Sequence, residues 1–188
     1  MADEQDKPFQ PENLELAAAA DPENNGLPEA ATIAQYIKDL SVENPNAPAV
    51  FQWGVQPQLD VQFNIAVNKV ADDVHEVTLK IDVSAKSDNG THFIVDLAYG
   101  GVFAFRNLPE EALPPFLLVE APRLLFPFAR QIVADAVQNT GFPPLLLDPI
   151  DFASAYMAQV EAANAGSEPN GHAAPEGPVF QPTDLGQA

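Results

Sequence analysis

The chain of 188 residues contains no cysteine. Disulfides, thiolate metal sites and cysteine nucleophiles are therefore excluded, and a reducing cytosol is the natural compartment. Basic residues are also scarce, with 8 Lys and Arg against 27 Asp and Glu, so the formal net charge is −19. Because nucleic acids and anionic membranes attract Lys- and Arg-rich surfaces, we expect neither as a partner. The charge suits a basic or an apolar partner, or it serves solubility alone.

Long uninterrupted apolar runs are missing as well. The first 15 residues, MADEQDKPFQPENLE, carry no apolar segment, so we expect no signal peptide and a cytoplasmic location. The stretch that comes nearest to a membrane helix is LPPFLLVEAPRLLFPFAR, residues 113–130, which contains Glu120 and Arg123. Its four prolines would break a helix and leave backbone groups unpaired in lipid, so we expect no stable membrane insertion.

Both ends of the chain have the composition of disordered segments. Residues 1–31 hold eight acids and four prolines, and residues 164–188 hold four prolines, four glycines and no Lys or Arg. Such segments cannot bury enough apolar surface to form a core. We therefore expect one folded domain over residues 32–163, between a disordered acidic tail at 1–31 and a disordered Pro- and Gly-rich tail at 164–188.

Apolar residues alternate with polar ones in three segments of this domain, 59–67, 77–85 and 93–99. A period of two is typical of half-buried strands. Asn89 and Gly90 favour a tight turn between the last two segments, and Asp72 and Asp73 favour a solvated turn between the first two. Because these connections are short, we expect antiparallel pairing.

A further strand is expected earlier, over residues 33–43. Strict alternation places Tyr36, Leu40 and Val42 on one face of this strand. The other face then carries Ile37, Asp39, Ser41 and Glu43. In the segment 93–99 and the residue before it, the same alternation predicts four side chains that point outward, namely those of His92, Ile94, Asp96 and Ala98. If both strands share a sheet, Ile94 lies among carboxylates. It is then either an ordinary surface isoleucine or the apolar anchor of a docking patch for a basic partner.

The character of the sequence changes after Gly100 and Gly101. Residues 122–139 carry apolar side chains at helical intervals, and Gly141 follows as a helix-ending residue. Asp151 is a suitable N-cap for a second helix. Four strands followed by helices predict an α+β domain. About 130 residues cannot hide an apolar sheet face and an apolar helix stripe in a monomer, so we expect self-association.

No motif of known catalytic chemistry is present in the sequence. The three histidines, His75, His92 and His172, are scattered, and neither a G-x-S-x-G motif nor a glycine-rich phosphate loop occurs. Asp72 and Asp73 could hold a metal ion, but a turn explains them better. We expect no enzyme, no cofactor and no metal site.

Aromatic residues are concentrated in Pro-rich segments outside the predicted strands and helices, among them Phe51, Trp53, Phe103, Phe105, Phe116 and Phe142. They either cover the ends of the core or line an apolar groove for extended, unfolded polypeptide, since aromatic contacts tolerate many sequences. An alternative from another class is a carrier of small apolar ligands, which would need one enclosed pocket per subunit.

Four segments together resemble the SecB family of bacterial protein-export chaperones. They are YIKDLSVENPNAP (36–48), ADDVHEVTLKIDVSAK (71–86), APRLLFPFARQIV (121–133) and GFPPLLLDPIDFASAYM (141–157). The resemblance covers about residues 33–160, in the family's order and without large gaps. It implies a four-stranded antiparallel sheet with a long helix and a C-terminal helix packed on one side, assembling as a dimer of dimers.

The resemblance also implies a function and its partners. The family holds newly made precursor proteins unfolded in the cytosol and delivers them to the translocation ATPase SecA, without a cofactor or catalytic activity. By position, the SecA-docking residues correspond to Asp39, Glu43, Ile94 and Asp96. The helix stripe expected to meet a sister subunit comprises Leu125, Phe128, Ile132, Val133 and Val137.

The client groove of the family is assigned to seven apolar positions of this chain, Phe51, Trp53, Val55, Phe103, Phe105, Phe142 and Tyr156. One departure from the family pattern occurs here. Relatives carry a tryptophan two positions after Trp53, where this chain has Val55. The departure leaves the lining of the groove open, because Trp53 either reaches the same surface from its shifted position or is simply exposed.

Overall fold

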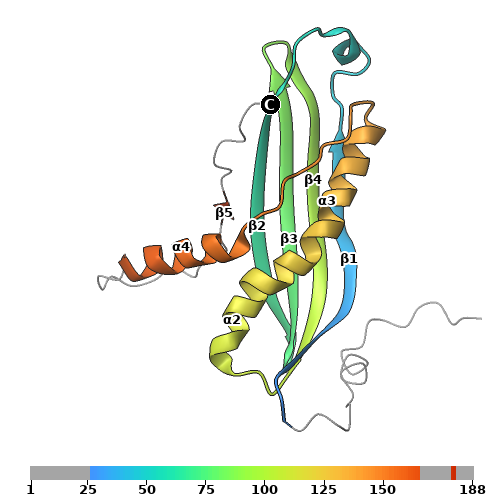
Figure 1. Ribbon diagram of the computed structural model, residues 1–188. Coiled ribbons are helices and arrows are strands. Elements are labelled where there is room, and N and C mark those ends of the chain that lie inside the picture. The colour runs from blue at the N-terminus through green and yellow to red at the C-terminus, as the bar shows by residue number, and fades with distance from the viewer. Residues whose placement is uncertain (1–25, 166–178, 181–188) are drawn as a thin grey trace, which may run out of the picture.

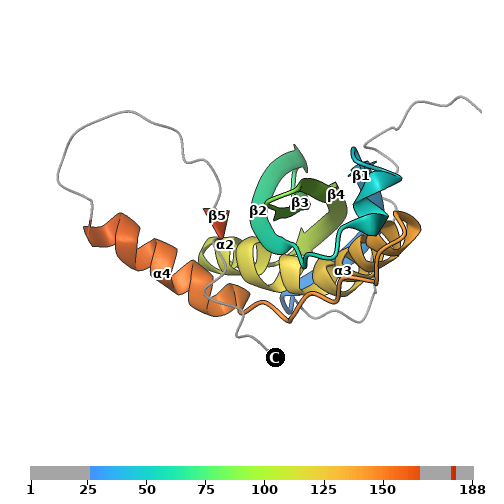
Figure 2. The same cartoon turned by 90° about the horizontal axis from the view of Figure 1, so that it is seen from above.

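The computed structural model describes residues 26–165 and 179–180, and its main body is a long, twisted antiparallel sheet with helices on one side (Figures 1 and 2). The four long strands are β1 (Glu29–Glu43), β2 (Gln58–Ala71), β3 (Val74–Ser87) and β4 (Gly90–Arg106). With the short β5 (Val179–Phe180), they lie in the order β1-β4-β3-β2-β5. The expected antiparallel sheet is confirmed, and β1 begins slightly before the expected domain start at residue 32.

Strands β2, β3 and β4 form a meander joined by two tight turns. Asp72 and Asp73 make the first turn, where Asp73 adopts a φ of 57°, and Asp88 with Asn89 makes the second. The tight turns that the sequence predicts at Asp72–Asp73 and beside Asn89 are therefore confirmed. The longer connection from β1 to β2 carries one 3-10 turn, η1 (Ala49–Gln52), and allows β1 to pair with β4 at the far edge.

The helical part follows β4 as one nearly continuous run. Its pieces are η2 (Glu110–Ala112), α2 (Leu113–Pro115), the π-helical turn η3 (Phe116–Glu120) and α3 (Ala121–Asn139). α3 crosses one face of the sheet diagonally (Figure 1). Its close approach depends on Gly101 of β4, because a Cβ there would lie 2.7 Å from Cδ2 of Leu125. We call the face that α3 covers the inner face of the sheet, and the opposite face the outer face.

The prolines of residues 113–130 do not break this run, so that expectation is wrong. Pro114 and Pro115 lie near its beginning, where backbone N–H groups lack intrahelical partners in any case. Pro122 is the second residue of α3, just after η3, whose wider π-helical turn makes room for a proline ring in a continuous helix. Only Pro127 lies in the interior of α3, on its exposed side.

By length and composition alone, the run Glu110–Asn139 is apolar enough to cross a membrane. In the fold it is the core helix of the domain. Leu125, Ala129 and Val133 are fully buried, and they pack in one cluster with strand residues such as Leu79 and Leu97. Burial of this stripe against the sheet accounts for part of the hydrophobicity of the segment, while Leu124 and Phe128 stay exposed.

Two expectations about which way side chains point are corrected by β-bulges. In β1, Lys38 is inserted between the paired residues Ile37 and Asp39, so Tyr36 shares the outer face with Asp39, while Ile37 turns inward. In β4, His92 is the extra residue beside the pair Ala85–Phe93. It is 2 % exposed and contacts aromatic rings, instead of pointing outward with Ile94.

The last helix, α4 (Phe152–Ala165), starts where the sequence predicts. Asp151 caps it, since its carboxylate accepts hydrogen bonds from the backbone N–H and the hydroxyl of Ser154. α4 projects away from the body on the β2 side (Figures 1 and 2). β5 lies in the segment expected to be a disordered tail, yet it pairs with β2 at Phe63 and Asn64. The remaining predicted tail residues, 1–25, 166–178 and 181–188, are outside the described part.

Candidate binding surfaces

The outer face of the sheet brings together the four residues expected to dock SecA. Glu43 of β1 lies directly opposite Ile94 of β4, and Asp39 lies opposite Ala98. Asp96 is two residues from both Ile94 and Ala98, so it projects from the same face. Directly opposed residues of an antiparallel pair share a face, so all four side chains form one surface.

Two further carboxylates extend this surface onto β2 and β3. Asp82 lies opposite Asp96, and Asp60 lies opposite Ser84, the β3 neighbour of Ile94. Alternation points both acids outward, but only the strand order reveals that they adjoin the docking residues. We call the whole surface the acidic face, and it consists of Asp39, Glu43, Asp60, Asp82, Ile94 and Asp96. All five acids are exposed.

The acidic face concentrates negative charge. Partial burial, then the charge of Asp96 and a hydrogen bond with its carboxyl, raises the pKa of Asp82 above the ordinary 3.8, although Lys80 opposes the shift. A raised carboxyl pKa means that the ionised form is destabilised, here by burial first and then by the neighbouring charge of Asp96. A basic partner that docks here would relieve this repulsion, whereas an acidic partner would increase it.

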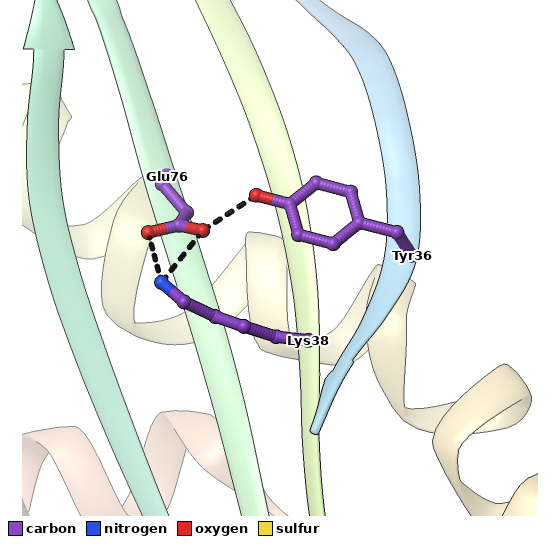
Figure 3. Close-up of polar contacts among 3 residues, drawn as sticks. All are labelled: Tyr36, Lys38 and Glu76. Carbon is purple, nitrogen blue, oxygen red and sulfur yellow. Dashed lines mark hydrogen bonds and ion pairs between the residues drawn. The ribbon is translucent and has the colours of Figure 1, made fainter. Parts of the chain in front are cut away.

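Three side chains make a hydrogen-bonded group farther along the outer face (Figure 3). Lys38 Nζ lies 2.7 Å from Oε2 and 2.9 Å from Oε1 of Glu76, and the Tyr36 hydroxyl donates to Oε1. Burial, and then the hydrogen bond and charge of Glu76, raises the pKa of Tyr36 to about 12. Burial would raise the pKa of Glu76 too, but hydrogen bonds from Lys38 and Tyr36 outweigh it, so this pKa lies below 4.5. We call these three residues the β1 clamp.

An aromatic cluster forms where the β1–β2 connection meets the end of α3. Phe142 lies at its centre, with ring centroids 5.6 Å from Phe51, 5.2 Å from Phe93 and 5.9 Å from His92. Trp53 packs edge-on against His92, with 5.1 Å between the centroids. Three predicted client residues, Phe51, Trp53 and Phe142, are thus brought together. The sequence gives no sign of His92 here, because a β-bulge turns it inward.

An open groove of about 660 Å³ adjoins this cluster, between β1 and α3. Its apolar wall includes Leu40 and Val42 of β1, Ile132 of α3, and Phe51. Phe51 is 53 % exposed, and Leu40 and Val42 are also exposed on the inner face. The groove therefore offers solvent-accessible apolar surface on the side of the sheet opposite the acidic face.

Four of the seven predicted client residues lie outside the aromatic cluster. The assignment of Phe103 and Phe105 to the client groove is wrong, because both are buried on the inner face of β4. Their ring centroids lie 5.8 Å (Phe103) and 5.0 Å (Phe105) from that of Phe116, which covers them. Inward alternation along a strand that is covered by helix buries Phe103 completely and leaves Phe105 only 7% exposed. Val55 is exposed in the β1–β2 connection, next to the cluster in sequence. Tyr156 is half-buried on α4, which projects away at the opposite edge of the sheet (Figure 1).

The helix stripe expected to meet a sister subunit is divided by the fold. Leu125, Val133 and Val137 are buried against the sheet of their own chain, so their side chains are not available for a contact with another subunit. Phe128 is 53 % exposed and Ile132 is half-buried, and both stay candidates. Counting apolar positions at helical spacing finds the stripe but cannot tell which part of it the chain's own sheet covers.

Comparisons with known proteins agree with this geometry. The family model described as preprotein translocase subunit SecB matches residues 23–163. The chain belongs to the SecB family. The family resemblance inferred from the sequence is thus confirmed. The SecB relatives that match this chain are named protein-export proteins.

Two relatives, both named protein-export protein SecB, illustrate the degree of similarity. That of Sphingopyxis alaskensis is 59% identical over 150 residues, covering 80% of this chain and 86% of the relative. That of Zymomonas mobilis is 54% identical over 157 residues, covering 82% and 96%. A solved SecB-like chaperone of Mycobacterium tuberculosis, in complex with an antitoxin peptide, has a TM-score of 0.53 at 18% identity, covering 73% and 95%. At that identity the structure supports the SecB fold alone.

Proposed function

We propose that this SecB-family protein is a cytoplasmic export chaperone that holds precursor proteins unfolded and delivers them to SecA. The observation that carries the proposal is the division of the sheet into two unlike surfaces. Exposed carboxylates surround Ile94 on the outer face, while exposed apolar side chains line a groove on the inner face. A delivery chaperone needs both surfaces at once, because client and acceptor must be bound together during transfer.

Client polypeptide binds, in this proposal, to the aromatic cluster and the groove beside it. Phe51, Val55 and Leu40 expose apolar surface that an extended chain can cover. Burial contributes about 25 cal/mol per Å² of apolar surface before the ordering costs of binding. A folded client has already buried its own apolar segments, so selection favours unfolded chains. The groove is open to solvent, unlike the enclosed pocket that a carrier of small apolar ligands needs.

SecA docks, in this proposal, on the acidic face through Asp39, Glu43, Ile94 and Asp96. Ile94 supplies an apolar anchor, and the surrounding carboxylates attract a basic surface. Docking requires no cofactor, and the protein itself performs no catalysis. Among the described residues, no group of three or more His, Asp or Glu side chains could hold a metal ion.

Assembly into a dimer of dimers is the remaining part of the proposal. Exposed apolar side chains outside the groove gather on the inner face of β1 and on the outward side of α3, namely Ile37, Leu124 and Phe128. Exposed apolar surface of this kind marks an interface in a monomer of this size. Several groove sites in one assembly would add avidity for a long unfolded client.

The direct test measures assembly, client binding and docking on the purified full chain. Light scattering should give a tetramer, and a denatured precursor should stay soluble in its presence, whereas the same precursor in its folded form should not bind. SecA should bind the chaperone with and without client. Equal binding of folded and denatured precursor would refute the chaperone function.

Charge reversal tests the docking residues. Asp96→Lys should weaken SecA binding at least tenfold and leave client binding and assembly unchanged, because repulsion replaces attraction. Asp72→Lys in the β2–β3 turn is the matched control, since it makes the same change of net charge away from the acidic face. Equal loss of SecA binding in both variants would show that net charge, and not the acidic face, governs docking.

A further inference from the structure

β2 lies at one edge of the four long strands and is a template for further strand pairing. It is 14 residues long, and its central segment, residues 61–68, contains no charged residue and no proline. Proteins usually blunt such an edge with charges, prolines or a covering segment, because its free N–H and C=O groups can pair with another chain. In the part of the chain that the structure describes, only Phe63 and Asn64 have a partner on this edge, and the partner is β5.

Exposed apolar side chains lie beside the part of the edge that β5 leaves open. Leu59 is 47% exposed and Val67 is 40% exposed, and both alternate onto the same inner face as Phe63. Phe63 lies midway between them along β2, so β5 pairs with the centre of an apolar row and leaves both of its ends uncovered. A longer extended chain on this edge would cover Leu59 and Val67 as well.

We propose that β5 is a tethered competitor of unfolded client: it occupies the centre of the β2 edge in the client-free chaperone, and an extended client segment displaces it. The inference rests on the proposed function, because it concerns binding of the same clients. It adds a regulation that the aromatic cluster and the groove do not provide, since a segment of the chaperone itself sets how strongly a client must bind.

The tether makes a very short strand an effective competitor. β5 consists of Val179 and Phe180 alone, and a strand of two residues would pair only weakly with β2 as a separate peptide. Residues 166–178 join β5 to α4, which leaves the body of the molecule on the β2 side (Figure 1). A short covalent link keeps a segment near its site at an effective concentration on the order of millimolar. A client at a far lower concentration therefore has to displace β5 to pair with this edge.

The sequence around β5 also keeps it displaceable. Pro178 and Pro182 flank it closely, and proline has no backbone N–H to donate to a neighbouring strand. β5 is thereby limited to a few backbone hydrogen bonds, whereas a client segment without proline can pair along much more of β2. Such a segment also buries Leu59 and Val67, which stabilises it further. The competition therefore favours long, extended and apolar client segments over short ones.

A reversible disulfide tests the competition in the full chain. Val179 lies opposite Asn64, and Cα atoms of opposed residues lie about 4.5–5.5 Å apart, which is within the range of a disulfide. The wild type has no cysteine, so Asn64→Cys with Val179→Cys gives one defined cross-link. Oxidation should hold β5 in place and weaken binding of a denatured precursor at least fivefold, and reduction should restore it. Ala66→Cys with Thr78→Cys, which joins β2 to β3, is the matched control and should bind equally in both redox states.

The reverse effect is measured by the rate at which the cross-link forms. Saturating denatured precursor should slow oxidation of Asn64→Cys with Val179→Cys at least fivefold, because competition between two occupants of one edge is reciprocal. The folded precursor should leave this rate unchanged, and the control pair should oxidise equally fast with and without precursor. In a third measurement, Val179→Pro should bind the denatured precursor at least threefold more tightly than the wild type, whereas Leu185→Pro should bind it equally.

Each outcome of these measurements decides the proposal. Equal precursor binding in the oxidised and reduced states overturns it, and so does a cross-linking rate that precursor leaves unchanged. A cross-link that does not form in the client-free protein also overturns it, since β5 would then not lie on β2. If no variant binds denatured precursor in either redox state, the proposed chaperone function fails, and the competitor role of β5 fails with it. If Val179→Pro binds precursor much more tightly than the wild type, both hold.

Discussion

Glu76 is a nearly buried carboxylate on the outer face, whereas the five carboxylates of the acidic face are exposed. Its neighbours in the β1 clamp explain how the fold tolerates it. Lys38 and Tyr36 supply three hydrogen bonds, and the pKa of the carboxyl is lowered although burial acts in the opposite direction. The exposed ion pair between Lys69 and Asp72 has the same chemistry without burial, so it makes little difference to folding.

Lys38→Met should therefore destabilise the protein in a pH-dependent way. The lowered pKa of Glu76 means that its ion pair stabilises the fold at neutral pH and that this contribution is lost as pH falls through the lowered pKa. We expect a loss of about 1–2 kcal/mol at pH 7, shrinking as the pH falls below 4.5 and through the lowered pKa of the carboxyl, because Glu76 then becomes protonated. Urea unfolding of both proteins between pH 3 and 7 measures the difference. A loss that is equal at all pH values would contradict this account.

The end of α3 shows how one glycine joins a helix to a binding surface. Gly141 has a φ of +92°, in the left-handed region, and its N–H bonds to the carbonyl of Gln138. A Cβ at this position would lie 2.9 Å from Cε1 of Phe51. The glycine thus both terminates the helix and leaves room for the ring that faces the groove.

Gly141→Ala should destabilise the fold by about 1–2 kcal/mol, because alanine resists a left-handed backbone and its methyl group collides with Phe51. The displaced ring should also weaken binding of an unfolded polypeptide. Thermal unfolding and a client-binding titration measure the two effects. Gly54→Ala is the control, since a Cβ at Gly54 meets nothing within 4 Å. If Gly54→Ala lowered stability and client binding as much as Gly141→Ala, the left-handed backbone and the contact with Phe51 at Gly141 would not explain the effect.

The short strand β5 covers part of the β2 edge of the sheet. Phe180 pairs with Phe63, and Val179 pairs with Asn64, so this part of β2 is not an open edge. Val179→Pro removes one backbone donor and constrains the backbone, and it should speed amide exchange around Phe63 and Asn64 about tenfold. Leu185→Pro, in the same predicted tail but outside β5, should have no effect there. Unchanged exchange in Val179→Pro would show that the tail does not protect β2 in solution.

Regular patterns could be predicted from the sequence, and interruptions of those patterns could not. Alternation over 59–67, 77–85 and 93–99 gave the central strands, and Asp151 marked the start of α4. The bulges at Lys38 and His92 could not be predicted, because one inserted residue reverses the alternation without any change of composition. The sequence assigns Phe103 and Phe105 to the groove because its alternation ends at Tyr99, whereas β4 continues to Arg106.

At the scale of the whole molecule, the sheet separates two kinds of interaction. The acidic face is electrostatic, with five exposed acids around one isoleucine, whereas the groove and the aromatic cluster are apolar. Long-range attraction between exposed charges is screened by salt, while burial of apolar surface is not weakened by it. The two surfaces of one molecule should therefore respond differently to the same change of solvent.

Raising NaCl from about 0.05 to 0.5 M should weaken SecA binding about tenfold or more, because the Debye length falls from about 14 to about 4 Å. Binding of a denatured precursor should stay constant or become tighter over the same range, since it depends on apolar contact at Phe51 and its neighbours. Both affinities can be measured by titration calorimetry on the same preparation. The variant Asp96→Lys should bind SecA weakly, and this residual binding should lose most of its salt dependence. If client binding weakened with salt as steeply as docking, the groove would be an electrostatic site, and the separation of the two surfaces by the sheet would not describe how this chaperone works.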